Sequence, residues 1–185
     1  MRQTHKYSRL TLALASALLC GAAQAENITY PGAALQSTML VGTSPYENVL
    51  APTTGTAANN TVTVSSLGAS AAPDFIFGGW HGTEKVSKNT LIIKEADLDA
   101  TVITAGGMGL GETSYNTLDI SSKSRAATHD TGPVYGGYSH SANSDWNTVS
   151  VTNRYVTDGI NGGYIDTRTT GTSTSHNSVV IDNSK

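Results

Sequence analysis

Asn116-Thr117-Leu118-Asp119-Ile120 and Asn147-Thr148-Val149-Ser150-Val151 are two copies of one short phrase, in which an asparagine and a hydroxyl residue precede alternating apolar side chains. The asparagines of successive copies are separated by 29, 27, 31 and 30 residues. A repeat of this period is typical of solenoid proteins, in which each repeat stacks on the next. The five copies are Asn60-Thr-Val-Thr-Val64, Asn89-Thr-Leu-Ile-Ile93, Asn116-Thr-Leu-Asp-Ile120, Asn147-Thr-Val-Ser-Val151 and Asn177-Ser-Val-Val-Ile181.

Each copy of the phrase has the pattern of a half-buried β-strand. Side chains alternate between the two faces of a strand, so the asparagine shares a face with the residues two and four positions later. In the first copy that face carries Asn60, Val62 and Val64, whereas the opposite face carries Thr61 and Thr63. This alternation with β-branched residues predicts a strand at every copy.

Pairs of adjacent glycines lie between the copies, at Gly78-Gly79, Gly106-Gly107, Gly136-Gly137 and Gly162-Gly163. Glycine inside a strand pattern marks a bend or a close approach of two backbones. With the first glycine as the centre, the residues two before and two after are expected to share one face of a second strand. These residues are Ile76 and Trp80, Thr104 and Met108, Val134 and Tyr138, and Ile160 and Tyr164.

Stacking of the repeats predicts columns of like side chains. A unit with two short strands cannot bury its apolar face alone, so neighbouring units must pair at the strand spacing of about 4.8 Å. The five asparagines then form one column, in which each amide bonds the next, and the apolar residues form two more. We predict an all-β fold, a parallel β-helix or solenoid of about four to five repeats over residues 60–185. An antiparallel β-sandwich would instead scatter the asparagines.

The first 25 residues have the form of a secretion signal. Basic residues precede an apolar run over residues 10–19, and Ala23-Gln24-Ala25 is a small-x-small cleavage site, so the mature chain is expected to begin at Glu26. The only cysteine, Cys20, lies in this segment. A mature chain without cysteine fits bacterial export better than eukaryotic secretion, where disulfides are usual. We expect the protein at the cell surface or outside the cell, or in the periplasm if no translocator serves it.

Residues 26–59 precede the first phrase and are expected to form an N-terminal leader or cap. Solenoids need such a cap on their terminal repeat, although a merely mobile leader would fit the sequence equally. One strand is expected near Met39–Val41. The predicted organisation is a signal peptide over residues 1–25, the leader or cap over residues 26–59 and the repeats over residues 60–185.

The charge of the chain argues against a nucleic-acid partner. Charged residues make up 14% of the chain and the formal net charge is −3. No basic patch with interleaved aromatic residues occurs in the sequence, and such a patch is what nucleic-acid binding requires. Serine, threonine, asparagine and glycine supply the polarity, as is typical of exported β-rich proteins.

No group of residues has the spacing of a catalytic, cofactor or metal site. The segment Gly106-Gly-Met-Gly-Leu-Gly111 has the glycines of a phosphate loop, but it lacks the lysine and the following helix. The histidines after residue 25 have no metal-ligand spacing, although His81 and His140 follow glycine pairs at similar offsets and are expected on one edge. We therefore predict a protein that is not an enzyme and holds no metal or cofactor. These histidines are His81, His129, His140 and His176.

The aromatic side chains are expected in two environments. Trp80 and Tyr138 follow glycine pairs and are expected to pack inward, whereas Tyr135, Trp146 and Tyr155 fall elsewhere in the repeat and include exposed residues. An exposed aromatic strip on a flat β-face would stack on sugar rings, and packing between repeats is the alternative. A polysaccharide lyase would also need loop acids and an arginine, for which the candidates are Asp97, Asp99, Asp130, Asp145, Asp158 and Asp166 with Arg125, Arg154 and Arg168.

The signal, the glycine pairs, the asparagine phrases and the absence of mature cysteines resemble the passenger segments of bacterial autotransporter proteins. The resemblance covers residues 60–185 and implies a right-handed parallel β-helix displayed at the outer membrane. It also implies a role in adhesion, aggregation or biofilm formation, with host or bacterial surface molecules, glycans among them, as partners. The chain reaches Lys185 without the translocating β-barrel of the family, so a truncated passenger segment or another export route is expected. The alternative is a carbohydrate-active β-helix, either a polysaccharide lyase or a sugar-binding module.

The last copy of the phrase predicts an uncovered end of the solenoid. Only four residues follow Ile181, and they contain no proline and no amphipathic helix. An uncovered terminal strand exposes unpaired backbone groups and invites pairing with another chain. We expect self-association through this strand, or fraying of the chain as far back as about Asn161.

Overall fold

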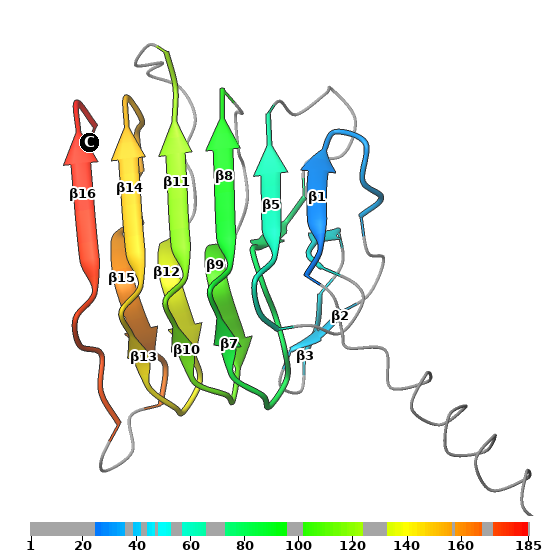
Figure 1. Ribbon diagram of the computed structural model, residues 1–185, viewed down its shortest axis with the longest axis vertical. Coiled ribbons are helices and arrows are strands. Elements are labelled where there is room, and N and C mark those ends of the chain that lie inside the picture. The colour runs from blue at the N-terminus through cyan, green and yellow to red at the C-terminus, as the bar shows by residue number, and fades with distance from the viewer. Residues whose placement is uncertain are drawn as a thin grey trace, which may run out of the picture.

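The computed structural model describes residues 25–35, 39–41, 44–46, 48–52, 57–65, 73–95, 102–123, 133–156, 158–167 and 172–184. These residues form sixteen β-strands, and they include no helix. Most of the strands lie in three parallel sheets that successive turns of the chain build around one core (Figure 1). The prediction of an all-β parallel solenoid is confirmed.

The five asparagine phrases and one earlier strand form the first and longest sheet, in which six strands lie side by side (Figure 1). The register is continuous, since Leu118 pairs with Leu91 on one side and with Val149 on the other. This register produces the two predicted apolar columns. The strands, in spatial order, are β1 (Asn27–Tyr30), β5 (Thr61–Val64), β8 (Thr90–Lys94), β11 (Thr117–Ser121), β14 (Thr148–Thr152) and β16 (Ser178–Asp182).

Two further parallel sheets complete the wall of the solenoid, and a separate antiparallel hairpin is formed by β2 (Met39–Val41) and β3 (Ser44–Tyr46). The second sheet contains β4 (Val49–Leu50), β6 (Phe75–Phe77), β9 (Val102–Gly109), β12 (Val134–Ser139) and β15 (Ile160–Ile165). The third sheet contains β7 (Val86–Ser87), β10 (Thr113–Ser114) and β13 (Ser144–Asp145).

The solenoid has about three turns, fewer than the four to five repeats predicted. A complete turn needs a strand in each sheet, and the third sheet has only three strands. The last turn passes from β15 to β16 through residues 172–177, which are not in a strand. Five asparagine phrases therefore overstate the number of complete turns.

The segment before Asn60 contributes to the solenoid itself. Its strands β1 and β4 pair in parallel with β5 and β6, so they add one level to each of the two longer sheets. The strand predicted near Met39–Val41 is present as β2. The predicted secretion signal, with Cys20, lies almost entirely outside the described residues, of which the first is Ala25.

The core is made of the two apolar columns of the first sheet and the facing residues of the second. Val62, Leu91 and Leu118 are completely buried, and so are Ile76 and Ile103 across from them. Each such side chain contributes about 1.5–3 kcal/mol through its burial. Because every level adds equivalent residues, the stability of the solenoid grows level by level.

The expectation that the residues flanking the first glycine share one face is wrong. Ile76 and Val134 contact the central core, whereas Trp80 and Tyr138 pack in a second cluster on the outer face of the sheet. Strand alternation fails here because both glycines of a pair face the interior. A Cβ on Gly136 would lie 3.0 Å from Asn147 Cβ, and one on Gly137 would lie 2.5 Å from Asn147 Nδ2.

The register of the second glycine pair is shifted by one residue. Gly106 is the first glycine of its pair, yet it lies beside Gly137, the second glycine of the next pair. In the same register, Ile103 lies between Val134 and Ile76. The position of the first glycine is taken by Ala105, and the extra residue is accommodated at Met108, which has a φ of 65° beside a shift in the strand register. This shift explains why Thr104 and Met108 differ from the other three flanking pairs, each of which consists of an aliphatic and an aromatic residue.

Candidate functional site

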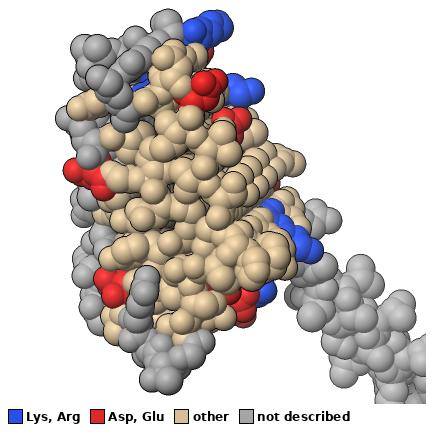
Figure 2. Space-filling model, turned by 90° about the vertical axis from the view of Figure 1, so that its left-hand side faces the viewer, with Lys and Arg blue, Asp and Glu red and all other residues tan. Residues whose placement is uncertain are grey.

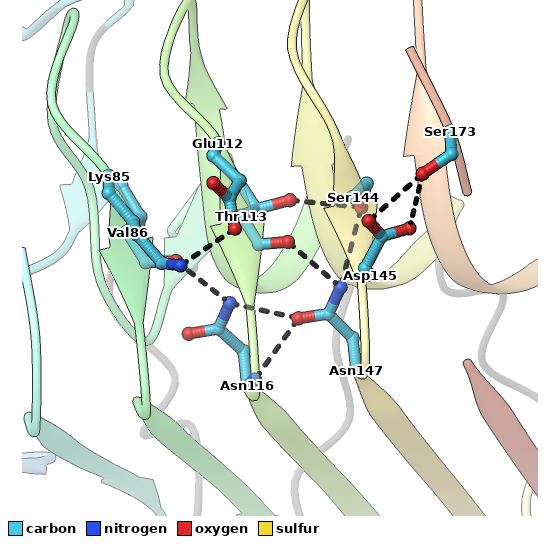
Figure 3. A network of polar contacts seen from close by, with 9 residues as sticks. All are labelled: Lys85, Val86, Glu112, Thr113, Asn116, Ser144, Asp145, Asn147 and Ser173. Atoms are coloured by element: carbon cyan, nitrogen blue, oxygen red, sulfur yellow. Dashed lines mark hydrogen bonds and ion pairs between the residues drawn. The ribbon is translucent and has the colours of Figure 1, made fainter. Parts of the chain in front are cut away.

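The five asparagines form one continuous column, as predicted, which we call the asparagine ladder. Asn116 shows its repeating geometry (Figure 3): its backbone N–H and its Nδ2 both donate to Oδ1 of Asn147, at 3.0 Å each. Its Nδ2 also donates to the carbonyl of Val86 at 3.2 Å. Its Oδ1 accepts from the backbone N–H and Nδ2 of Asn89 at 3.1 and 3.0 Å. Every polar atom of this buried side chain is therefore bonded within the fold.

Hydroxyl groups continue this polar interior beside the ladder (Figure 3). Thr113 Oγ1 donates to Ser144 Oγ at 2.9 Å, and Ser144 Oγ donates to the carbonyl of Gly137 at 3.0 Å. Asp145, at the rim, accepts from the hydroxyl of Ser173 at 3.1 and 3.0 Å. These amide, hydroxyl and carboxylate groups bond one another, which supports a structural role for the ladder; the buried Ser114 Oγ beside them has no hydrogen-bond partner among the described residues.

The residue before each ladder asparagine has a left-handed backbone. The φ angles are 64° at Asn59, 57° at Lys88, 58° at Tyr115, 59° at Trp146 and 56° at His176. Such a conformation costs a residue other than glycine roughly 1–2 kcal/mol. It turns the chain at a corner, so the asparagine points inward while the preceding side chain points outward.

Three of these corner residues stack on one another, and we call them the corner stack: Tyr115, Trp146 and His176. The ring centroids of Tyr115 and Trp146 are 6.0 Å apart with planes at 9°, and those of Trp146 and His176 are 3.9 Å apart with planes at 4°. Tyr115 and Trp146 are 52% and 48% exposed. The prediction of exposed aromatics is confirmed for Trp146 and Tyr155, but Tyr135 is buried. Because the rings cover each other's faces, the stack offers mainly ring edges to a partner.

A second aromatic group, the outer aromatic cluster, lies on the outer face of the second sheet around Phe77 and Met108. The ring of Tyr135 contacts those of Tyr138 and Tyr164, with centroids 5.0 and 5.3 Å away. Trp80 also packs here, so the expectation that Trp80 and Tyr138 point inward is wrong. Burial raises the pKa of the Tyr135 phenol, and nearby Tyr164, Asp166 and Asp158 raise it further.

This raised pKa predicts a loss of stability in alkali. Above pH about 10 the unfolded chain loses the Tyr135 proton, while the folded chain keeps it. The stabilisation by the neutral phenol is therefore complete below that pH and is lost as the pH rises through the raised pKa. Urea denaturation below and above pH about 10 should show a smaller loss for Tyr135→Phe than for the original chain. Equal losses would contradict this assignment.

The terminal rung, by which we mean β16 (Ser178–Asp182), is exposed along its whole length. Val179 and Ile181 continue the two apolar core columns, yet they are 42% and 53% exposed. Their neighbours in the same columns, Val149 and Val151, are 0% exposed. The predicted open end of the core is confirmed within the described chain.

The opposite end of the first sheet is partly covered. Tyr30 is buried at the end of one apolar column, and Ala33 and Leu35 pack against the same core. The backbone N–H of Ala33 donates to the carbonyl of Thr29 at 3.0 Å, so the chain after β1 folds back over the free edge. The two ends of the solenoid therefore differ.

The predicted histidine pair lies on one edge but is not in contact. Gly109 lies between them, since its Cβ would strike the carbonyl of His81 and its own carbonyl accepts from the N–H of His140. His140 Nδ1 is 3.2 Å from Asp166 Oδ2, and His81 Nε2 is 3.9 Å from Glu84. His129 lies outside the described residues.

The loop acids proposed for a lyase are only partly described. Asp145 is bonded to Ser173 and Asp166 to His140, whereas Arg154 is buried. Asp97, Asp99, Asp130, Arg125 and Arg168 lie outside the described residues. Within the described part of the chain, no three His, Cys, Asp or Glu side chains are grouped so as to hold a metal ion.

Sequence reasoning missed the corner stack. The available signal was the constant position of Tyr115, Trp146 and His176 immediately before a ladder asparagine. In the described ranges, no helix is long and apolar enough to cross a membrane. Comparison of the chain with protein-family models, curated proteins and solved structures found no match.

Proposed function

We propose that this chain is a non-enzymatic, exported surface protein, an adhesin-like passenger segment that promotes aggregation by self-association through its terminal rung. The observation that carries the proposal is the exposure of Val179 and Ile181 at the end of otherwise buried columns. Exposed apolar area favours association by about 25 cal/mol per Å² removed from water. An edge strand with unpaired backbone groups adds the hydrogen bonds that orient a partner.

Sedimentation of the chain over a range of concentrations tests the proposal. We expect association at tens of micromolar, and we expect Val180→Lys to abolish it, because a lysine on an edge strand prevents pairing. Ser150→Lys is the matched control, since Ser150 pairs with Val180 in the same outward column but lies on β14, between two strands. A chain that stays monomeric with β16 folded, or a Val180→Lys variant that associates normally, would overturn the proposal.

The non-enzymatic part of the proposal is tested separately. Incubation with polygalacturonate or alginate should release no unsaturated product above the rate of a heat-denatured sample. Measurable cleavage would instead favour the lyase alternative.

A sugar-binding module is the second candidate, and the outer aromatic cluster favours it. Tyr138 and Tyr164 are partly exposed there, and His140 contacts the Tyr138 ring at 5.4 Å while approaching Asp166. Aromatic rings beside polar groups are the usual chemistry of saccharide binding. A glycan-binding screen with Tyr164→Ala as the comparison tests this candidate, and no retained saccharide with the original chain would rule it out.

A further inference from the structure

The free backbone groups of the terminal rung alternate along β16. The backbone N–H of Ser178 donates to the carbonyl of Asn147 at 2.9 Å, and the carbonyl of Asp182 accepts from the N–H of Asn153 at 3.0 Å. In a parallel pair, alternate residues point both groups at the same neighbour. Ser178, Val180 and Asp182 therefore point toward β14. Val179 and Ile181 present their N–H and carbonyl groups at the free edge.

A head-to-tail arrangement would require an equally open edge at the other end of the first sheet. That edge is β1, where the carbonyl of Thr29 already accepts from the N–H of Ala33. Pro31, next to the strand, has no N–H to offer. Among the described residues, the chain folds back over part of the β1 edge and not over the edge of β16, so the partner of one terminal rung is best supplied by another terminal rung.

We propose, building on the self-association above, that two copies pair their β16 strands antiparallel around a two-fold axis at Val180. This register places Val179 of one copy opposite Ile181 of the other, so the apolar core columns run on from copy to copy. The free N–H and carbonyl groups of the same two residues then bond reciprocally, as in a hydrogen-bonded antiparallel pair.

The two neighbouring registers of the β16 pair are energetically less favourable. Centring the axis on Val179 would put Asn177 opposite Ile181, and centring it on Ile181 would put Asn183 opposite Val179. Either choice places an amide in an apolar column, where an unsatisfied polar group costs about 1–3 kcal/mol. Only the register centred on Val180 keeps apolar side chains opposite apolar ones on the inner face.

The outer face of the strand is also self-complementary in this register. Ser178 lies opposite Asp182 of the second copy, so a hydroxyl can donate to a carboxylate, and Val180 lies opposite itself. Figure 2, which looks onto this end of the solenoid, shows a mostly uncharged surface with the Lys, Arg, Asp and Glu side chains mainly toward its margins. Little charge has to be desolvated when two such ends meet.

A two-fold contact of this kind closes on itself, so it yields a dimer and no fibre. The two solenoids would lie end to end, with their β1 ends pointing apart. Copies displayed on two different cells could pair in this way, which would join the cells through one isologous contact.

Single cysteines test the geometry, because Cys20 is the only cysteine of the chain and Cys20→Ser removes it. In this background Val180→Cys should form a disulfide-linked dimer under mild oxidation. The two residues at the axis form a non-hydrogen-bonded pair, with Cα atoms about 4.5 Å apart, within the range of a disulfide. Ser178→Cys alone and Asp182→Cys alone should stay unlinked, since like positions lie about 13 Å apart along the strand. A mixture of these two variants should cross-link.

The outcomes separate this inference from the proposed function. A Val180→Cys chain that sediments as a dimer but does not cross-link would overturn the two-fold register and leave self-association standing. Cross-linking of Ser178→Cys with itself would show a different register. Assemblies larger than a dimer without Val180→Cys linkage would show head-to-tail stacking. A monomer at every concentration would overturn both proposals. Ser150→Cys, one strand inward, is the control and should remain unlinked.

Discussion

Replacing Asn116 with alanine is expected to destabilise the fold by about 3 to 5 kcal/mol. The substitution leaves the backbone N–H of Asn89 without its acceptor and removes one of the two acceptors of Asn89 Nδ2. Oδ1 of Asn147 loses the Nδ2 donor and keeps only the backbone N–H of residue 116, and the carbonyl of Val86 also loses a donor. These groups are buried, so water cannot replace the lost bonds. Urea denaturation monitored by circular dichroism measures the loss.

Asn177→Ala is the matched control for Asn116→Ala. Asn177 accepts the same two bonds from Asn147, at 2.8 and 3.2 Å, but it is only partly buried at the end of the ladder. Solvent can reach the groups left behind, so a smaller loss of about 1 to 2 kcal/mol is expected. Equal losses for the two variants would show that burial of the ladder is not what makes it stabilising.

Gly137→Ala is the second large expected effect, with a loss of about 2 to 3 kcal/mol. The new Cβ would lie 2.5 Å from Nδ2 of Asn147 and 2.7 Å from Oγ1 of Thr113. Neither atom moves easily, because both side chains are held by the polar interior. Thermal and urea unfolding of the variant give the size of the effect.

Two comparisons locate the cause of the Gly137→Ala effect. Gly82→Ala places its Cβ in open space, with no atom within 4 Å, and should change the stability by less than about 0.5 kcal/mol. Gly137→Ala combined with Asn147→Ala should cost less than the sum of the single losses, because the clashing amide is gone. Strict additivity would mean that the glycine is required for some reason other than contact with the ladder.

The asparagine phrase predicted the first sheet because two constraints agree. Period-two apolar alternation assigns Val149 and Val151 to the interior, and stacking of equal phrases permits only one register that keeps Asn147 in line with Asn116. Both features are read from residue types alone. The same reasoning predicted that the apolar residues of the last phrase are exposed, and in the described chain Val179 and Ile181 are exposed.

The glycine pairs were harder to interpret because the strand bends where they occur. Alternation is a reliable guide only while the chain is extended, and here two consecutive residues face inward. The distance from each glycine to the next ladder asparagine is a better guide to the register than the glycine pairs are. Gly79, Gly106 and Gly137 each precede a ladder asparagine by ten residues. Aligning the repeats on that distance places Ile103, and not Thr104, beside Ile76. Met108 is then recognised as the extra residue of its repeat and is not matched with Trp80 and Tyr138.

The corner stack could not be predicted from residue type. Tyr115, Trp146 and His176 adopt a left-handed backbone that these residues rarely choose, and the surrounding fold imposes it. The direction of their side chains depends on that conformation. Local propensity therefore says nothing about the stack, and only the shared position before an asparagine could have indicated it.

Hydrogen exchange at the terminal rung tests the central claim most directly. The N–H groups of Ser178 and Val180 point toward β14 and should be protected equally at all protein concentrations. Those of Val179 and Ile181 point at the free edge, so they should exchange rapidly in dilute solution and become protected as the concentration rises to tens of micromolar. Rapid exchange of Val179 and Ile181 at every concentration, with Ser178 and Val180 still protected, would contradict pairing through β16.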